Sequence, residues 1–411
     1  MASVPLKYVL LRVSLSIWVL AAAPSTAQEP LNAAESQSLG RVFDNDALPD
    51  LLHCSIQARK PMLDFAFRFD VGFVVSCSLA RFAGRATKVL IYARITPEGG
   101  KPLLLGETYR LPEATSAAKP SQLKQDVEMS GGFAVGEGQY QVEVLVLDQE
   151  TGRTSRKRWR ASVAHSGRPG GTQVAVPPAT VLPIGVWHWR IKMDTSGKGL
   201  RIAILLDAAP LNPRSPALRA WDRAFLLGSL SSLLNQIPCA SVRLRAFNLD
   251  QQRELFRQDQ FDDAGFMELA ETLRTMELGT VSSRVLQQRE GGVNLLADYA
   301  NSELRAADPA DAVIILGPET QYFAKVSFTM FKKRESPNPH FYYFEYFPGH
   351  WPASSLPDAL SSLTKRLEGT VCQIFSPGDL ARCVQKVLMR VQPTAEPSPT
   401  GRWPARPAPS H

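Results

Sequence analysis

The hydrophobic period of the sequence changes at about residue 200, and this change constrains the fold more than any other feature. Before it, short apolar–polar alternations such as Lys88–Ile95 and Gln139–Leu147 are separated by glycine-containing turns, which predicts antiparallel strands. After it, continuous apolar runs such as Leu200–Leu206 and Ala312–Leu316 are separated by helical patterns. Such runs are typical of parallel strands that helices cover on both faces.

We therefore predict a multidomain chain, in which an N-terminal all-β sandwich is followed by a C-terminal α/β doubly wound domain. The sandwich, of the immunoglobulin-like kind, is expected at 49–163 and the α/β domain at 198–392. Glycine and proline residues between them predict a linker and joining strand at 164–197. The polar segment 28–48 predicts a flexible leader, and the proline-rich segment 393–411 predicts a disordered tail.

Residues 1–27 have the features of a secretory signal peptide. Lys7 and Arg12 supply positive charge, Val13–Ala23 is apolar, and Ser25–Ala27 offers small residues for cleavage. The apolar run is too short to cross a hydrocarbon core of about 30 Å. We expect an exported protein, periplasmic or extracellular, with no stable membrane span after the signal is removed. Export also argues against a nucleic-acid partner, despite a net charge of +7.

Export permits disulfide bonds, and the chain has five cysteines. Cys54 and Cys77 fall on the apolar faces of their predicted strands, so a bridge between them is one prediction. Cys372, in a predicted strand, and Cys383, in the helix that follows it, form a second candidate pair. Each of these cysteines is equally compatible with a small buried apolar side chain. Cys239 is left over.

The C-terminal half resembles a von Willebrand factor A domain, of the type found in exported acidobacterial proteins. The segments that carry this resemblance are the first strand ending in Asp207, the hairpin Val242–Arg257, Glu290–Asp298, Ala312–Leu316 and Phe375–Leu380. The resemblance implies a metal-ion-dependent adhesion site at the ends of the parallel strands.

That implied metal site is degenerate in this sequence. In the loop that begins with Asp207, Ala209 and Leu211 replace both serines of the family's DxSxS pattern. Near the position of another expected aspartate, only Glu319 offers a carboxylate. A single carboxylate in place does not hold Mg²⁺ with useful affinity. We therefore predict no bound metal and no other cofactor, with Asp207 as a vestige of the site.

These features favour a non-catalytic, metal-independent protein of the adhesion type that binds a protein partner. The candidate binding residues lie in loops at the strand ends: Asp207, Asn212, Asn294, Glu319 and Tyr322. Neither GxSxG nor HExxH occurs, so no catalytic residue is assigned. Two alternatives remain open: a structural or assembly scaffold of a bacterial envelope, and a hydrolase whose site has no recognisable motif.

Overall fold

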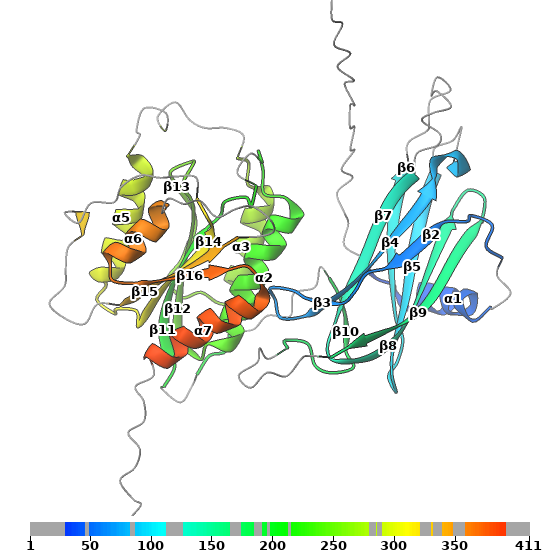
Figure 1. Ribbon diagram of the computed structural model, residues 1–411, viewed down its shortest axis with the longest axis horizontal. Helices are drawn as coiled ribbons and strands as arrows, with labels where there is room; N and C mark the ends of the chain where they lie inside the picture. Colours follow the sequence, from blue (N-terminus) through cyan, green and yellow to red (C-terminus); the bar gives the residue numbers. More distant parts are fainter. Residues whose placement is uncertain are drawn as a thin grey trace, which may run out of the picture.

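The computed structural model contains two units side by side, a β-sandwich and an α/β unit (Figure 1). The structure describes residues 29–45, 49–82, 87–111, 126–164, 174–184, 191–194, 198–212, 215–278, 285, 290–320, 330–331, 339–347 and 358–391. The expected signal peptide, the expected tail and parts of the expected linker lie outside these ranges. Within them, no helix is both long and apolar enough to cross a membrane.

The sandwich consists of two sheets in which neighbouring strands are antiparallel. The first sheet has the order β1 (Glu29–Pro30), β6 (Leu103–Leu111), β5 (Thr87–Pro97), β8 (Gly138–Asp148) and β9 (Thr154–Val163). The second has the order β10 (Val181–Pro183), β7 (Asp126–Val135), β4 (Phe69–Ser78) and β2 (Ser55–Ala58), while β3 (Met62–Leu63) also pairs with β4 and the 3-10 helix η1 (Leu79–Phe82) follows β4. Alternate residues of both sheets, including Phe73, Ile91 and Val144, form one buried core between them.

The segment that was predicted to be a flexible leader is structured wherever the structure describes it. After β1, helix α1 (Ala33–Asp44) begins at a capping box, in which Asn32 Oδ1 accepts a hydrogen bond from Glu35 N at 2.9 Å. At the other end of the helix, Phe43 is completely buried. The prediction of a flexible leader is therefore wrong, because a helix cap and one aromatic anchor hold this segment.

The α/β unit is built on a six-stranded sheet. Its order is β13 (Arg253–Gln258), β12 (Cys239–Asn248), β11 (Leu200–Asp207), β14 (Ala312–Pro318), β15 (His340–Tyr346) and β16 (Thr370–Ile374). All neighbouring strands are parallel except β13, which is antiparallel to β12. Because β11 is central, its alternate residues Ile204 and Leu205 are both buried, one on each face of the sheet.

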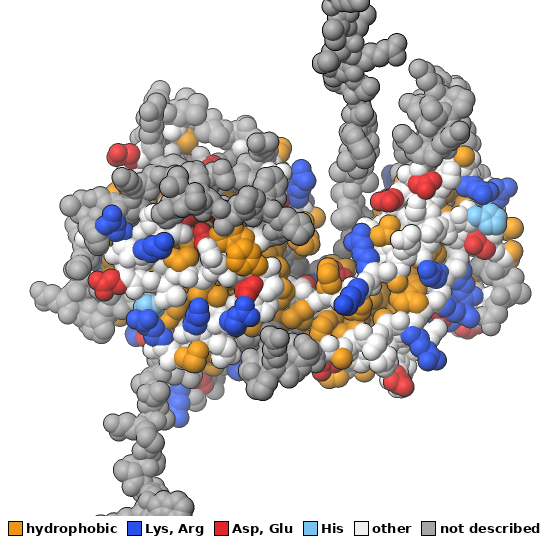
Figure 2. Space-filling view, in the orientation of Figure 1, with side chains coloured by type: hydrophobic (Ala, Val, Ile, Leu, Met, Phe, Trp, Pro, Cys, Tyr) orange, Lys and Arg blue, Asp and Glu red, His pale blue; other side chains and the backbone are white. Residues whose placement is uncertain are grey.

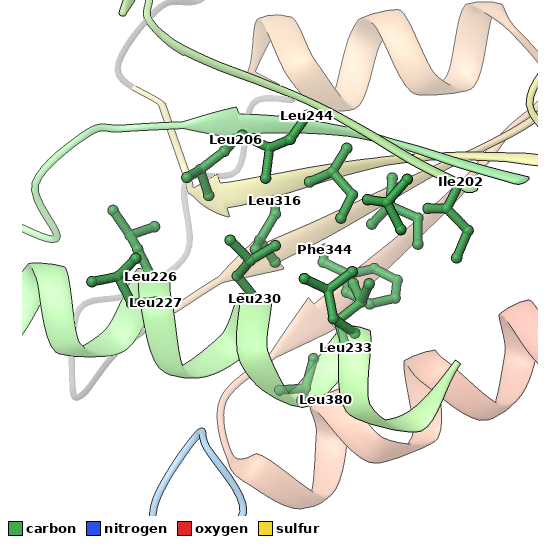
Figure 3. Close-up of a cluster of buried hydrophobic side chains, with 14 of the residues drawn as sticks. Ile202, Leu206, Leu226, Leu227, Leu230, Leu233, Leu244, Leu316, Phe344 and Leu380 are labelled. Atoms are coloured by element: carbon green, nitrogen blue, oxygen red, sulfur yellow. The ribbon is translucent and has the colours of Figure 1, made fainter. Parts of the chain in front are cut away.

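Helices cover both faces of this sheet. On one face lie α2 (Ala220–Gln236), α3 (Asp263–Thr275) and α7 (Pro377–Val391), and on the other lie α5 (Gly291–Leu304) and α6 (Ala359–Arg366). Figure 3 shows Leu230 and Leu233 of α2 facing Leu316 and Phe344 of the sheet, with Leu380 of α7 beside them. The carboxyl ends of the five parallel strands therefore meet at one edge of the sheet.

The alternating sequence Leu63–Phe69 predicts a strand, but most of it forms a turn that reaches the α/β unit (Figure 1). The Asp64 side chain accepts hydrogen bonds from the backbone N of Ala66 and of Arg68 and thereby closes the turn. Phe67 is 1% exposed and belongs to the core of the α/β unit. The prediction of one continuous strand here is wrong, because Phe65 and Phe67 pack against the other unit rather than inside a sheet.

The structure also corrects the interpretation of Gly131 and Gly132 as a break between strands. Both glycines lie inside β7. A Cβ atom at Gly132 would lie 2.9 Å from Ile184 Cδ1 and 3.2 Å from Val71 O. The close packing of neighbouring segments requires glycine at this point, so the residue marks crowding in a strand rather than the end of one.

Candidate functional site

The carboxyl ends of the parallel strands bring several acidic side chains together, and Asp207 lies at their centre. Asp207 is the last residue of β11 and is completely buried. Neither of its carboxyl oxygens forms a hydrogen bond of good geometry, and the backbone of Leu249 is the one nearby donor that lowers its pKa. The neighbouring strand approaches closely, because a Cβ at Gly317 would lie only 2.7 Å from Asp207 Cβ. A buried carboxyl group without a well-formed hydrogen bond is costly to a fold, so it calls for a functional explanation.

Burial is the main reason why the pKa of Asp207 is raised well above its ordinary value, and the charges of Asp250 and Asp358 raise it further. Asp250 lies just after β12 and is exposed. The pKa of Asp250 is also raised by desolvation, although the side chain still reaches water. Both effects favour the protonated form of the Asp207 carboxyl.

Asp358 is the second fully buried carboxyl of the cluster, but it has partners. It precedes α6, and its Oδ1 accepts a hydrogen bond from Ser361 N at 2.7 Å, which caps the helix. Its Oδ2 accepts from Thr320 N at 2.9 Å and lies 3.2 Å from the hydroxyl of Tyr343. The Tyr343 hydroxyl is also 2.9 Å from Pro318 O. Asp358 thus ties α6 to the ends of β14 and β15.

Glu345 lies two residues beyond Tyr343 on β15 and is 5% exposed. Ser361 Oγ donates a hydrogen bond to its Oε1 at 3.2 Å. Burial, together with the charges of Asp358 and Glu319, raises the pKa of Glu345 to about 7. The edge of the sheet therefore holds Asp207, which forms no hydrogen bond of good geometry, together with Asp358 and Glu345, which are held by hydrogen bonds.

The residues predicted as binding candidates do not all join this cluster. Asp207 is at its centre, and Glu319 follows β14, where its backbone N donates to Tyr346 O at 3.4 Å. Asn294 is exposed in the first turn of α5, and Asn212 lies half-buried beyond β11. Tyr322 lies outside the described residues.

The sequence analysis missed Asp250, Tyr343, Glu345 and Asp358. Two of them carried a local signal, since Asp250 directly follows a predicted strand and Asp358 sits where a helix needs a cap. In the described part of the chain, no group of three or more His, Cys, Asp or Glu side chains is arranged to hold a metal ion. The chemistry available at this edge is proton transfer between carboxyl groups.

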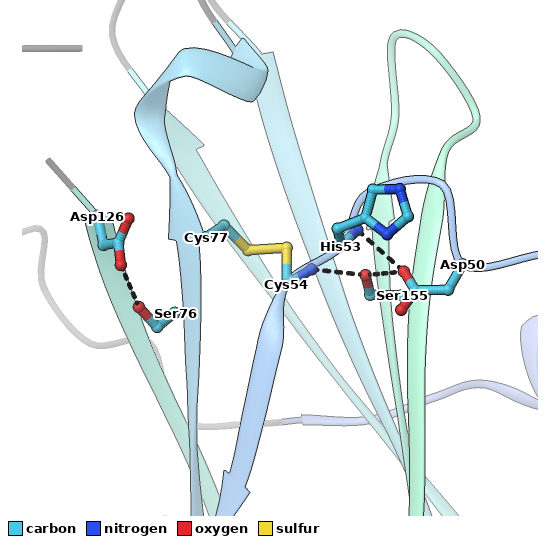
Figure 4. The surroundings of a disulfide bond; sticks show 7 residues. All are labelled: Asp50, His53, Cys54, Ser76, Cys77, Asp126 and Ser155. Atoms are coloured by element: carbon cyan, nitrogen blue, oxygen red, sulfur yellow. Dashed lines mark hydrogen bonds between the residues drawn. A yellow bond between two sulfur atoms is a disulfide. The ribbon is translucent and has the colours of Figure 1, made fainter. Parts of the chain in front are cut away.

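The cysteines form one of the two predicted pairs. Cys54 and Cys77 are joined by a disulfide of 2.02 Å that links the start of β2 to β4 (Figure 4). Cys54 N also donates to Ser155 Oγ at 2.8 Å, and that hydroxyl donates to Asp50 Oδ1.

Cys372 and Cys383 are buried and free, so the second candidate bridge is not formed. A hydrogen bond from Cys383 lowers the pKa of Cys372, because it stabilises the thiolate of Cys372. Cys239 is also buried and free, and its thiol donates to Ile237 O at 3.1 Å.

No protein-family model and no curated protein matches this sequence. The similar solved structures are glycoside hydrolases. A glycosyl hydrolase family 2 member from Bacteroides cellulosilyticus DSM 14838 is 11% identical with a TM-score of 0.19, over 76% of this chain and 37% of that chain. A β-glucuronidase from Bacteroides uniformis is 10% identical with a TM-score of 0.20, over 71% of this chain and 36% of that chain. A family 123 glycoside hydrolase from Clostridium perfringens is 8% identical with a TM-score of 0.22, over 78% of each chain.

This chain spans little more than a third of the two Bacteroides enzymes. These structures are glycoside hydrolases, so they do not bear out the predicted resemblance to a von Willebrand factor A domain or the non-catalytic, adhesion-type function that was tied to it. The part of the predicted fold class that named such a domain is likewise not borne out. The six-stranded, largely parallel sheet with helices on both faces does not depend on that resemblance. TM-scores of 0.19 to 0.22 assign no activity or substrate to this chain.

Proposed function

We propose that this chain is a hydrolase whose reacting groups are Asp207 and Asp250. The proposal rests on the Asp207 carboxyl, which is completely buried and forms no hydrogen bond of good geometry. A buried aspartate with a structural role is held by well-formed hydrogen bonds, as Asp358 is at the start of α6. A carboxyl group whose pKa is raised by burial is suited to act as a general acid.

Hydrolysis needs an acceptor for a proton of the attacking water and a donor for the leaving group. In this assignment, Asp250 takes a proton from water while the water oxygen bonds to the reacting carbon. The bond to the leaving oxygen breaks, and Asp207 gives its proton to that oxygen. Burial raises the pKa of both carboxyl groups, and the Asp250 charge raises that of Asp207 further. A pair of carboxyl groups, one acid and one base, is the machinery of glycoside hydrolysis. We therefore assign glycosides as the substrate class.

We also infer that the protein works outside the cytoplasm, either in the periplasm or in the extracellular space. The signal-like sequence of residues 1–27 supports export. The Cys54–Cys77 disulfide supports it independently, since disulfides persist in oxidising compartments.

The test is the release of p-nitrophenol from a panel of aryl α- and β-glycosides. General acid–base catalysis contributes about 100-fold or more to rate, so Asp207→Asn and Asp250→Asn should each lower kcat/KM by at least about 100-fold. Asp263→Asn is the matched control, because Asp263 is an exposed aspartate of the same unit. Its kcat/KM should equal that of the wild type.

The pH profile separates a general acid from a merely structural residue. Because Asp207 acts in its protonated form, kcat/KM should fall at high pH as Asp207 loses its proton. In Asp207→Asn, any residual activity should lack that limb. Hydrolysis of no member of the panel, or equal rates for the wild type and Asp207→Asn, would overturn the proposed function.

A further inference from the structure

Two free cysteines of the α/β unit come from neighbouring elements, β16 and α7, which pack against each other (Figure 1). In β16, Cys372 and Ile374 are buried on one face, because alternate residues of a strand point the same way. In α7, Cys383 belongs to the apolar stripe that includes Leu380 and Val387, and this stripe covers the same core. The two thiols therefore lie on facing sides of one helix–sheet contact.

The thiols of this pair are in direct contact. Cys372 and Cys383 are both buried, and the Cys383 thiol donates a hydrogen bond to the sulfur of Cys372. That hydrogen bond is the main reason why the pKa of Cys372 is lowered, and the positive charge of Lys386, three residues after Cys383, lowers it further. A disulfide needs Cβ atoms about 3.5–4.5 Å apart. Two thiols in hydrogen-bond contact are already near that separation, so a small approach of α7 to β16 is enough to close the bridge.

Cys239 shows how a buried cysteine of the same unit behaves when its thiol does not face another thiol. Its thiol bonds to the backbone of its own segment, at Ile237 O. Burial raises the pKa of Cys239 to about 12. Because the thiolate is the species that attacks a disulfide, Cys239 is protected from this reaction while Cys372 is prepared for it.

We propose that Cys372 and Cys383 are a redox-active dithiol, which a small-molecule disulfide oxidises to a bridge that fastens α7 to β16. The Cys372 thiolate attacks one sulfur of the oxidant, and the other oxidant sulfur leaves and takes up the proton that Cys372 released. Cys383 then loses its proton and attacks the Cys372 sulfur, which releases the second oxidant sulfur as a thiol. The protein thus loses two electrons and two protons, and one oxidant disulfide becomes two thiols.

Local opening of α7 gives an oxidant access to the buried sulfurs. In the described part of the chain, α7 is the last helix, and β16 lies at one end of the sheet order. Terminal elements open more readily than central ones. The bridge closes a short loop and opposes that opening once it has formed. The inference is independent of the proposed hydrolytic activity.

The first experiment maps the disulfides of the full chain after incubation with millimolar oxidised glutathione. Remaining thiols are blocked with N-ethylmaleimide under denaturing, mildly acidic conditions, and the protein is then digested. Trypsin cuts after Arg366, Arg382 and Lys386. The bridge should therefore appear in the mass spectrum as peptide 367–382 joined to peptide 383–386.

The same sample contains its own controls. The Cys54–Cys77 bridge should be present, and Cys239 should carry the maleimide. The proposal fails if Cys372 and Cys383 also carry the maleimide. It fails equally if either of them is joined only to glutathione or to Cys239.

The second readout is the difference in Tm between the oxidised and the reduced protein. Cys383→Ser keeps the Cys54–Cys77 bridge, so comparison with this variant isolates the contribution of the second bridge. The difference in Tm should be larger in the wild type than in Cys383→Ser by about 5 °C or more. Cys239→Ser is the matched control and should keep the wild-type difference. Equal differences in the wild type and Cys383→Ser would show that no bridge fastens α7 and would overturn the proposal.

Discussion

The two units of this protein treat a buried carboxyl group in opposite ways. In the sandwich, Glu143 is 5% exposed and forms ion pairs with Arg94 at 2.7 Å and with Arg156 and Arg158 at 2.5 Å. Burial opposes its ionisation, but hydrogen bonds from the three arginines outweigh that effect and lower the pKa of Glu143. In the α/β unit, Asp207 is as deeply buried, forms no hydrogen bond of good geometry, and has a raised pKa.

This difference separates a structural charge from a functional one. The arginines around Glu143 also donate to the carbonyl oxygen of Phe43, so the network holds helix α1 against the sheet. A third carboxyl shows that burial alone does not make the distinction. Glu107 of the sandwich has a pKa raised to about 7 by burial, yet a hydrogen bond from Tyr109 partly offsets that rise. What sets Asp207 apart is the lack of any well-formed hydrogen bond to its carboxyl oxygens.

On the face shown in Figure 2, the basic side chains of neither unit form one continuous patch. Lys and Arg side chains there lie apart from one another, with apolar and uncharged groups between them. The arginines that matter for the fold are instead turned toward Glu143 and Phe43. The net charge of +7 is therefore a poor guide to the role of any single arginine.

The largest effect is expected where the two units meet. Phe67 of the sandwich is buried in the α/β core, and its neighbour Phe65 contacts Phe225 with ring centroids 4.5 Å apart. Phe67→Ala should cost about 4 kcal/mol, the usual cost of removing a buried phenylalanine side chain. The units should then unfold in two separate calorimetric transitions instead of one, because the contact that couples them is lost.

Met62→Ala is the control for this prediction, since Met62 lies on β3 beside the same turn but is 68% exposed. It should leave the calorimetric trace unchanged. A Phe67→Ala protein that melts in one transition at the wild-type temperature would show that the units are not coupled through this turn.

The next largest effect tests the structural half of the comparison. Glu143→Ala leaves Arg94 and Arg156 partly buried without their carboxylate. Breaking a buried pair by removing one partner costs about 3 kcal/mol or more, and urea unfolding should show that loss. Glu150→Ala, at an exposed position of the turn after β8, should change the free energy of unfolding by less than about 0.5 kcal/mol. A similar small change for Glu143→Ala would mean that the arginines find other acceptors.

The parts of the fold that a local sequence pattern decides could be predicted from the sequence. The parts that a contact between distant segments decides could not. The strand predicted at Leu200–Asp207 is β11 with the same bounds, because a strand buried on both faces leaves an unbroken apolar run. The strand predicted at Leu63–Phe69 failed because Phe65 and Phe67 pack against a different unit. Gly131 and Gly132 wrongly indicated a break between strands for a related reason. The close packing that requires glycine at position 132 comes from Ile184, which is distant in the sequence.

The same distinction applies to the candidate site. Asp207 and Glu319 were visible in the sequence, because each follows an apolar strand whose end is easily recognised. Asp358 and Tyr343 were not, because their importance comes from a contact between them that depends on the packing of α6 against β15. The absence of well-formed hydrogen bonds to Asp207 is likewise a property of the folded chain, and no sequence pattern encodes it.

The last and sharpest test of the comparison is the pH dependence that Asp207 adds to stability. The pKa of Asp207 is raised in the folded state above 3.8, its ordinary value in the unfolded chain. At any pH between the unfolded-state pKa and the folded-state pKa, the unfolded chain has released a proton that the folded chain retains. Wild-type stability should therefore be complete below about pH 4 and fall as the pH rises, by up to about 1.4 kcal/mol per pH unit from this one group. Asp207→Asn cannot titrate, so its urea midpoints should match the wild type near pH 3 and exceed it increasingly toward neutral pH. Asp263→Asn should follow the wild-type curve throughout, and parallel curves for the wild type and Asp207→Asn would show that Asp207 is ionised in the folded protein.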